Sequence, residues 1–84
     1  MIVHVRLFAR ARDLAGTDIL RVEMPDGGTI SDLRRRLAAE YPRLTSLLER
    51  SALAVENEFA DDSLMLSDNA EVALLPPVSG GESI

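Results

Sequence analysis

One long apolar stripe at helical spacing limits the folds that are open to this chain. Ile30, Leu33, Leu37 and Tyr41 recur at steps of three or four residues, with Ala38 alongside, which is the pattern of a helix that buries one face. The other apolar segments are short and mostly alternate with period two. Because one helix can cover only one face of a sheet, the sequence predicts the α+β class.

The sequence also indicates where this helix begins and ends. Thr29 has the chemistry of an N-cap, and Asp32 three residues later completes a weaker version of the capping box. Pro42 closes the helix. Three leucines beyond it predict an irregular or short helical cover for the core: Leu44, Leu47 and Leu48.

Alternation with period two predicts strands at residues 2–8, 18–24, 52–56 and 72–75, with a brief piece at Phe59. Residues 9–15 favour a short helix that Gly16 ends. The gap between the first two strands is shorter than a usual parallel crossover, so we expect an antiparallel pair. The first and last strands are expected to run parallel. Asn57-Glu58 is interpreted as a tight turn. The prediction is a mixed sheet of four to five strands with one long helix packed on one face.

The other face of this sheet lacks a second long helix to cover it. Alternation places Phe8 and Leu75 outside the core, and Phe59 is expected near them. A partly apolar patch of this kind marks a partner site. A loop that covers the patch is an equally open alternative.

Composition excludes several classes of function. The chain has 84 residues, enough for one domain with one core. Its net charge of −5 disfavours nucleic acid as a partner, and the run Arg34-Arg35-Arg36 is interpreted as a solvated helix face. Cysteine is absent, which removes disulfides and thiolate chemistry. Without a signal peptide or an apolar run of about 20 residues, no membrane segment and a cytoplasmic location are expected.

Candidate catalytic groups are few. His4 is the only histidine, so we expect no transition-metal site. Asp61-Asp62 is interpreted as a charged turn, and Ser79 lacks the strand–turn–helix setting of a hydrolase nucleophile. We therefore expect no enzyme activity from this chain by itself.

The last predicted strand ends in an unusual way. Pro76-Pro77 stop the ladder because they lack N–H groups, and they favour an extended course. Gly80-Gly81 follow, and then Glu82-Ser83-Ile84. One interpretation is a stiff arm that can enter a narrow slot; the other is a frayed terminus. We accordingly divide the chain into a domain of residues 1–78 and a flexible C-terminal tail of residues 79–84.

Four stretches, in order along nearly the whole chain, carry a family resemblance. They are residues 7–16 (LFARARDLAG), 29–33 (TISDL), 53–57 (LAVEN) and 74–81 (LLPPVSGG). The opening F-A-x-x-R-[DE]-L-x-G with the ending P-P-V-S-G-G is a specific combination. Together they resemble the MoaD/ThiS family of ubiquitin-like β-grasp sulfur carriers, and within it MoaD, the small subunit of molybdopterin synthase.

The resemblance implies a carrier with a ubiquitin-like β-grasp fold. In that family an E1-like adenylyltransferase (MoeB-like) adenylates the C-terminal glycine carboxylate, which is converted to a thiocarboxylate. The tail then enters the large subunit of molybdopterin synthase (MoaE-like), and its sulfur builds the dithiolene of molybdopterin from cyclic pyranopterin monophosphate. ATP and magnesium are used by the activating partner, so no cofactor bound by this chain is implied.

Carried over by position, Gly81 would hold the sulfur and Gly80 would let the backbone fit the slot. A side chain would widen the tail just where two enzymes must reach its carboxyl carbon. The residues implied to bind partners are Phe8, Arg12, Phe59, Leu75, Pro76, Pro77 and Val78.

The chain departs from the family pattern in two places. Leu74-Leu75 stand where aromatic residues are frequent, which puts the fit to a partner in doubt. Gly81 is followed by Glu82, so its carbonyl lies in a peptide bond. We expect a processing protease to cut after Gly81.

Three alternatives stay open. The carrier could serve another sulfur pathway, for thiamin thiazole or cysteine. The chain could be a ubiquitin-like protein modifier, although the absence of lysine excludes lysine-linked chains of itself. It could also be a plain β-grasp binding module with a vestigial Gly-Gly.

Overall fold

The structure is a computed structural model that describes residues 1–76. Its elements follow one another along the chain as β1 (Ile2–Arg6), α1 (Ala9–Ala15), β2 (Ile19–Glu23), α2 (Ile30–Glu40), the 3₁₀ turn η1 (Pro42–Leu44), α3 (Thr45–Arg50), β3 (Ala52–Val55), β4 (Glu58–Phe59) and β5 (Ala70–Leu75). The predicted boundary between a domain of residues 1–78 and a tail of residues 79–84 lies outside the described residues.

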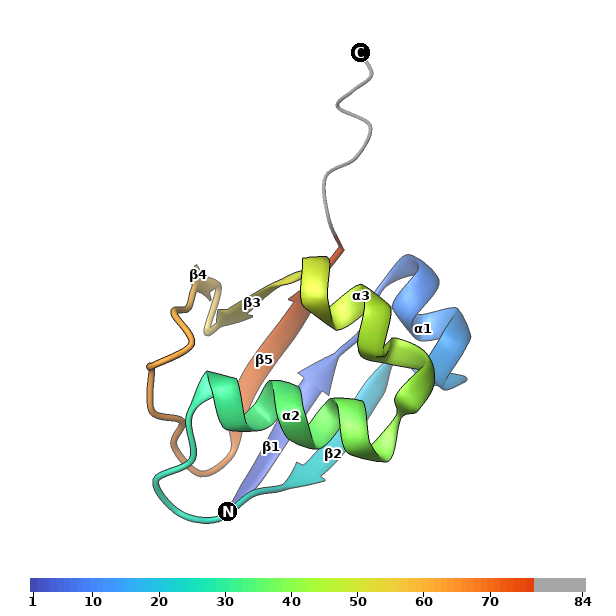
Figure 1. Cartoon of the computed structure of the whole chain (residues 1–84). Helices are drawn as coiled ribbons and strands as arrows, with labels where there is room; N and C mark the ends of the chain where they lie inside the picture. Colours follow the sequence, from blue (N-terminus) through green and yellow to red (C-terminus); the bar gives the residue numbers. More distant parts are fainter. Residues whose placement is uncertain (77–84) are drawn as a thin grey trace.

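The five strands form one mixed sheet in the order β2-β1-β5-β3-β4. β1 pairs antiparallel with β2 and parallel with β5. β3 pairs antiparallel with β5 on one side and with β4 on the other. Both predicted strand relationships and the α+β class are therefore confirmed. In Figure 1, α2 crosses one face of the sheet, and α3 and α1 lie toward the end at which β1 and β5 terminate.

α2 begins and covers the sheet as its sequence predicts. The Thr29 side chain accepts a hydrogen bond from the Asp32 backbone N–H, and the Asp32 carboxylate accepts one from the Thr29 N–H, which completes the capping box. Ile30, Leu33 and Leu37 are fully buried. Tyr41 is the C-cap rather than a helical residue and is only partly buried.

The core lies between the sheet and the helices. Its strand residues come from alternate positions, which point to one face of the sheet: Val3, Val5, Leu20, Val22, Leu53, Val72 and Leu74. The predicted helical cover is also confirmed, because Leu44, Leu47 and Leu48 are buried in η1 and α3. None of the helices among residues 1–76 has both the length and the apolar character needed to cross a membrane.

The hairpin between β3 and β4 turns one residue earlier than predicted. The turn residues are Glu56 and Asn57, with φ of 51° and 71°, and Glu58 already belongs to β4. Two successive residues with positive φ are the signature of a tight hairpin turn that matches the twist of its strands. The prediction of Asn57-Glu58 was wrong because the sequence has no glycine here to mark the turn.

Three strands are also shorter at their ends than alternation predicts, and β5 begins at Ala70, two residues earlier than predicted. β2 is shorter by one residue at each end. β1 ends at Arg6, and the Leu7 N–H donates to the Asp18 carbonyl oxygen at 2.8 Å just before β2 begins. β3 ends at Val55, where the turn starts. Alternation continues beyond a strand wherever the chain still has one face against the core.

Candidate functional site

The carboxyl ends of β1 and β5 lie side by side, because these central neighbours run parallel. Arg6, the last residue of β1, pairs with Ala73 of β5. β5 then runs through Leu75 to Pro76, which is exposed and is the last described residue. The chain therefore leaves the sheet, on its way to the predicted tail, at the edge at which β1 leads into Phe8. We call this the carboxyl edge.

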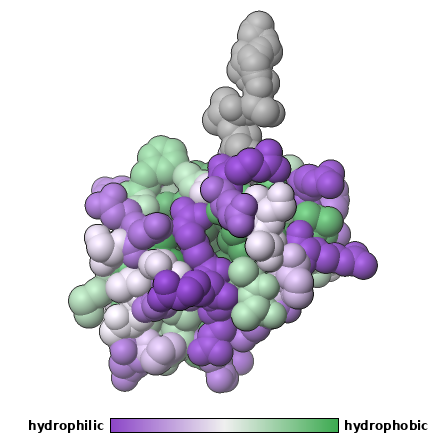
Figure 2. Space-filling view, viewed as in Figure 1, coloured by the Kyte–Doolittle hydropathy of each residue, from purple (hydrophilic) through white to green (hydrophobic). Residues whose placement is uncertain are grey.

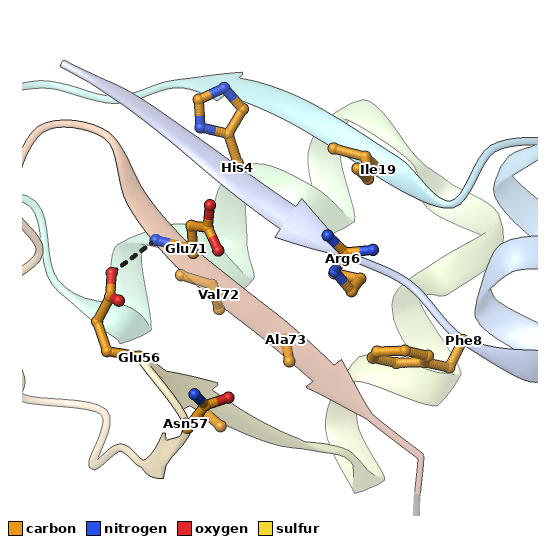
Figure 3. Close-up of a pocket in the computed structure, with 10 residues that line it drawn as sticks. His4, Arg6, Phe8, Ile19, Glu56, Asn57, Glu71, Val72 and Ala73 are labelled. Carbon is orange, nitrogen blue, oxygen red and sulfur yellow. Dashed lines mark hydrogen bonds between the residues drawn. The ribbon is translucent and has the colours of Figure 1, made fainter.

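The face of the sheet opposite α2, here the open face, carries a row of paired residues that crosses all five strands. The row runs in the order Phe59, Ala54, Ala73, Arg6 and Ile19. Figure 3 looks onto this face, with the helices behind the sheet. A hollow of about 320 Å³ lies along the row, and Phe8, Arg6 and Ile19 are among the residues that line it. In residues 1–76 the hollow stays open and Phe8 and Phe59 are exposed, so the alternative of a loop that covers this face is not found there.

Phe8 stands at one end of this hollow and keeps 38% of its surface exposed. It is the N-cap of α1, and its carbonyl oxygen accepts from the Ala11 N–H at 3.1 Å. Ala9, the next residue, has φ of 50°, a left-handed conformation that a residue with a Cβ rarely adopts. The sharp turn between β1 and α1 thus presents an aromatic ring at the carboxyl edge.

The other residues predicted to bind partners fall at different places. Phe59 lies opposite Ala54 at the outer strand and is 79% exposed. Leu75 is half-buried on β5, and Arg12 is exposed on α1 but does not line the hollow. Pro76 follows Leu75 and is exposed. The remaining predicted site residues lie outside the described residues: Pro77, Val78, Gly80 and Gly81.

Phe8 is the one residue of the hollow's lining that the sequence predicted as a site residue, and Ile19 and Ala54 are two of those that it missed. Ile19 is 42% exposed on the edge strand β2, and alternation against buried Leu20 already placed it outside the core. Ala54 is buried although its pairing puts it on the open face. Alternation with Leu53 and Val55 places Ala54 on this face, but an alanine by itself gives no signal of a binding surface.

The open face also carries charge. His4 pairs with Glu71 on one side and with Arg21 on the other. Glu56 and Glu71 join the turn to β5, because the Glu71 N–H donates to the Glu56 carboxylate at 3.3 Å (Figure 3). The described residues contain no group of three or more histidine, aspartate or glutamate side chains that could hold a metal ion. The arrangement is that of a binding surface beside the start of the tail.

Comparison with known proteins places this geometry in a family. The sequence profile of the ThiS family matches residues 5–81. The chain belongs to the ThiS family. The match begins at Val5 in β1 and continues through Gly80 and Gly81, so Phe8 and the Gly-Gly of the tail fall within one family domain.

Relatives of this ThiS-family chain include the molybdopterin synthase sulfur carrier subunit of Dictyostelium discoideum. The two are 39% identical over 80 residues, which cover 92% of this chain and 93% of the relative. The agreement extends over nearly the full length of both, and it confirms the resemblance to MoaD that the four sequence stretches carry.

Two solved structures have the same fold. SAMP1 from Haloferax volcanii is 28% identical with a TM-score of 0.85, over 96% of this chain and 100% of that one. A chain from the complex of subunits 1 and 2 of molybdopterin-converting factor from Helicobacter pylori is 27% identical with a TM-score of 0.71, again over 96% and 100%. The ubiquitin-like β-grasp fold predicted for the chain is confirmed.

Proposed function

We propose that this chain is the sulfur carrier subunit of a molybdopterin synthase, with Gly81 as the residue that carries the sulfur. The observation that supports this most directly is the 39% identity to a sulfur carrier subunit along nearly its whole length. The fold agrees with the role. The central strand β5 leads out of the sheet at the carboxyl edge, beside the exposed Phe8, so a partner that binds this edge also meets the start of the tail.

Charging the tail takes two steps in this proposal. A carboxylate oxygen of Gly81 attacks the α-phosphorus of ATP on an E1-like adenylyltransferase, and pyrophosphate leaves. Hydrosulfide from a sulfur donor then attacks the carbonyl carbon, where a C–S bond forms as the C–O bond to AMP breaks. The product is a thiocarboxylate. Glycine suits this chemistry because it leaves the carbonyl carbon open to attack.

The first step needs a free carboxylate. Gly81 is joined to Glu82 by a peptide bond in the sequence, so we propose that a processing protease hydrolyses this bond and releases Glu82-Ser83-Ile84. ATP and magnesium act on the adenylyltransferase, and the chain itself supplies only the tail and the docking surface.

Discharge takes place on a MoaE-like large subunit. The sulfur moves from the thiocarboxylate to the pterin precursor, and water supplies the oxygen that restores the carboxylate. A dithiolene holds two sulfur atoms, so each molybdopterin consumes two charged carriers. The Helicobacter pylori complex of subunits 1 and 2 supports a partner of this kind.

The test is reconstitution with purified components. A chain that ends at Gly81 is incubated with the adenylyltransferase, ATP and a sulfur donor, and its intact mass is measured. We expect the mass change of one oxygen-to-sulfur exchange, followed by molybdopterin formation when the large subunit and the pterin precursor are added. The matched control is the chain that ends at Ile84. If the short chain were never charged, or if it were charged but supported no molybdopterin synthesis, the proposal would fail.

A second candidate is a ubiquitin-like protein modifier, which the likeness to SAMP1, a small archaeal modifier protein, favours. A modifier would be activated as the same Gly81 adenylate. An amine of another protein would then attack the Gly81 carbonyl carbon, and an isopeptide bond would form as AMP leaves. Isopeptide-linked targets in cells, seen as Gly81 remnants on lysines after proteolysis, would support this candidate. If no such targets were found in cells that contain the thiocarboxylated chain, the sulfur carrier would remain as the function.

A further inference from the structure

Three arginines from three separate elements line a second hollow on the helical side of the molecule. They are Arg10 of α1, Arg43 of η1 and Arg50 of α3, around a space of about 390 Å³ with Leu14 and Leu47 in its wall. We call this the arginine hollow. Figure 2 shows hydrophilic side chains over this part of the surface, near α1 and α3.

These arginines differ from the arginines of α2 in their partners. Within residues 1–76, none of the three forms an ion pair with a carboxylate, although each is exposed. Each α2 arginine has one: Arg34 pairs with Asp62, Arg35 with Asp32 and Arg36 with Glu40. Three guanidinium groups around one space repel one another, so an anion placed among them is stabilised by all three.

The arginine hollow flanks the carboxyl edge. α1 starts directly after Phe8, where β1 leaves the sheet. Arg50 is two residues before Ala52, and Ala52 pairs with Leu75, the last residue of β5. α1 and α3 lie toward the carboxyl edge on the helical side of the sheet (Figure 1). The arginine hollow that they help to line is therefore on the helical side of this edge rather than on the open face.

Charge is distributed unevenly along β1. At its amino end, the Asp26 carboxylate lies 3.5 Å from the N-terminal ammonium, and the Asp68 carboxylate accepts from the Ile2 N–H at 2.8 Å. At its carboxyl end stand Arg6 and the arginine hollow. The chain as a whole carries −5, and the three arginines of the hollow outnumber the acidic residues Asp13 and Glu49 on the same elements, so positive charge is concentrated at the tail-bearing end of an acidic chain. Such a distribution orients a partner during encounter.

We propose that the arginine hollow is an electrostatic docking site for carboxylate side chains of a protein that receives the tail. This rests on the proposed function, because it takes for granted a partner that works on Gly81. Six residues run from Pro76 to Gly81. A partner that acts at the end of that segment must hold the folded domain by other contacts. The three arginines, which form no ion pair within residues 1–76, supply such contacts on the helical side of the carboxyl edge.

The test compares binding of three forms of the chain, each ending at Gly81, to the purified adenylyltransferase and to the purified large subunit. The first is wild type, the second is R10Q/R43Q/R50Q, and the third is R35Q/R36Q, which removes charge from α2 as a control. We expect the triple variant to bind at least one enzyme about 10- to 100-fold more weakly at low salt, with a flatter salt dependence. The control should stay within about threefold of wild type, because exposed pairs on one helix contribute little.

Two further measurements separate charge from folding and from other anions. Thermal unfolding of the triple variant checks that it is folded, and R10K/R43K/R50K, which keeps the charge, should recover most of the affinity. ATP alone is titrated against the free chain. If ATP bound wild type but not the triple variant, the hollow would be a nucleotide site and the assignment to a protein would be wrong.

The outcomes distinguish this inference from the proposed function. Suppose that the wild-type chain is charged with sulfur, and that the triple variant binds both enzymes as tightly as wild type and with the same salt dependence. This result would overturn the inference and leave the proposed function standing. A wild-type chain that bound neither enzyme would overturn both.

Discussion

Leu75 lies opposite Ala52 in the last pair of the β3–β5 ladder, on the face of the sheet that points away from α2. Its neighbour Leu74 points the other way and is almost fully buried in the core. Two leucines that are adjacent in sequence thus face different surroundings at the point where β5 leaves the sheet. Leu74 therefore contributes to the stability of the core, whereas Leu75 is available for contact with a partner.

Truncation of the two leucines should therefore affect different properties. Leu74→Ala removes a core side chain and should lower the free energy of unfolding by about 2–5 kcal/mol. Leu75→Ala is expected to cost clearly less stability, because the side chain is only half-buried, and to weaken binding of the large subunit. Urea unfolding and binding measurements on both variants check this. Equal losses of stability would show that Leu75 is part of the core.

The sequence predicts those parts of the fold that local chemistry dictates. Thr29 and Asp32 mark the start of α2 because a capping box uses only residues within one helical turn. The alternation of Val3 and Val5 predicts the buried face of β1 for the same local reason. The directions of β1 relative to β2 and to β5 were also predicted, from the short connection between β1 and β2 and from the crossover through the long helix.

Features that depend on long-range contacts could not be predicted. Local alternation places Ala54 on the open face, but its pairing with Ala73 and Phe59, which puts it in the row across the sheet, depends on distant parts of the chain. The arginine hollow brings Arg10 together with Arg43 and Arg50, which lie far from Arg10 in the sequence. Phe8 and Leu75 were placed outside the core by alternation, but their shared edge follows only from the parallel pairing of β1 and β5.

The turn between β3 and β4 gives a second prediction. Asn57 has φ of 71°, a conformation that glycine adopts without strain and a β-branched residue does not. Asn57→Gly should keep or raise the free energy of unfolding by a few tenths of a kcal/mol, and Asn57→Val should lower it by about 1–2 kcal/mol. Chemical denaturation of the two variants tests this, since the residue is exposed and loses no packing. If valine were tolerated as well as glycine, Asn57 would not adopt this conformation.

The open face gives a third prediction. Phe59 and Met65 are both strongly exposed, at 79% and 65%, but only Phe59 belongs to the row that crosses the sheet. Phe59→Ala should weaken binding of the large subunit about tenfold or more, as loss of an aromatic anchor does, whereas Met65→Ala should change it less than about twofold. Both variants should keep their unfolding free energy within about 0.5 kcal/mol. Equal effects on binding would place the docking surface elsewhere.

The capping box of α2 gives a prediction about pH. The Asp32 carboxylate accepts from the Thr29 backbone N–H at 3.0 Å, and this bond, with smaller contributions from the Thr29 hydroxyl and Arg35, holds the pKa of Asp32 below its ordinary value of 3.8. Because the folded-state pKa is lowered, the ionised carboxylate stabilises the fold above pH 3.8, and this contribution is lost as pH falls through the folded-state pKa. Asp32→Asn should therefore be less stable than wild type at neutral pH, and the difference should shrink in acid.

Urea unfolding of wild type and Asp32→Asn at neutral pH and in acid below pH 3.8 measures this difference directly. Asp61→Asn is the control, because the Asp61 side chain bonds no group of residues 1–76 and its substitution should leave the pH dependence unchanged. Thr29→Ala removes the other half of the capping box and should cost about 1 kcal/mol at neutral pH. A stability difference between wild type and Asp32→Asn that stayed constant into acid would mean that the charge of Asp32 does not stabilise the start of α2.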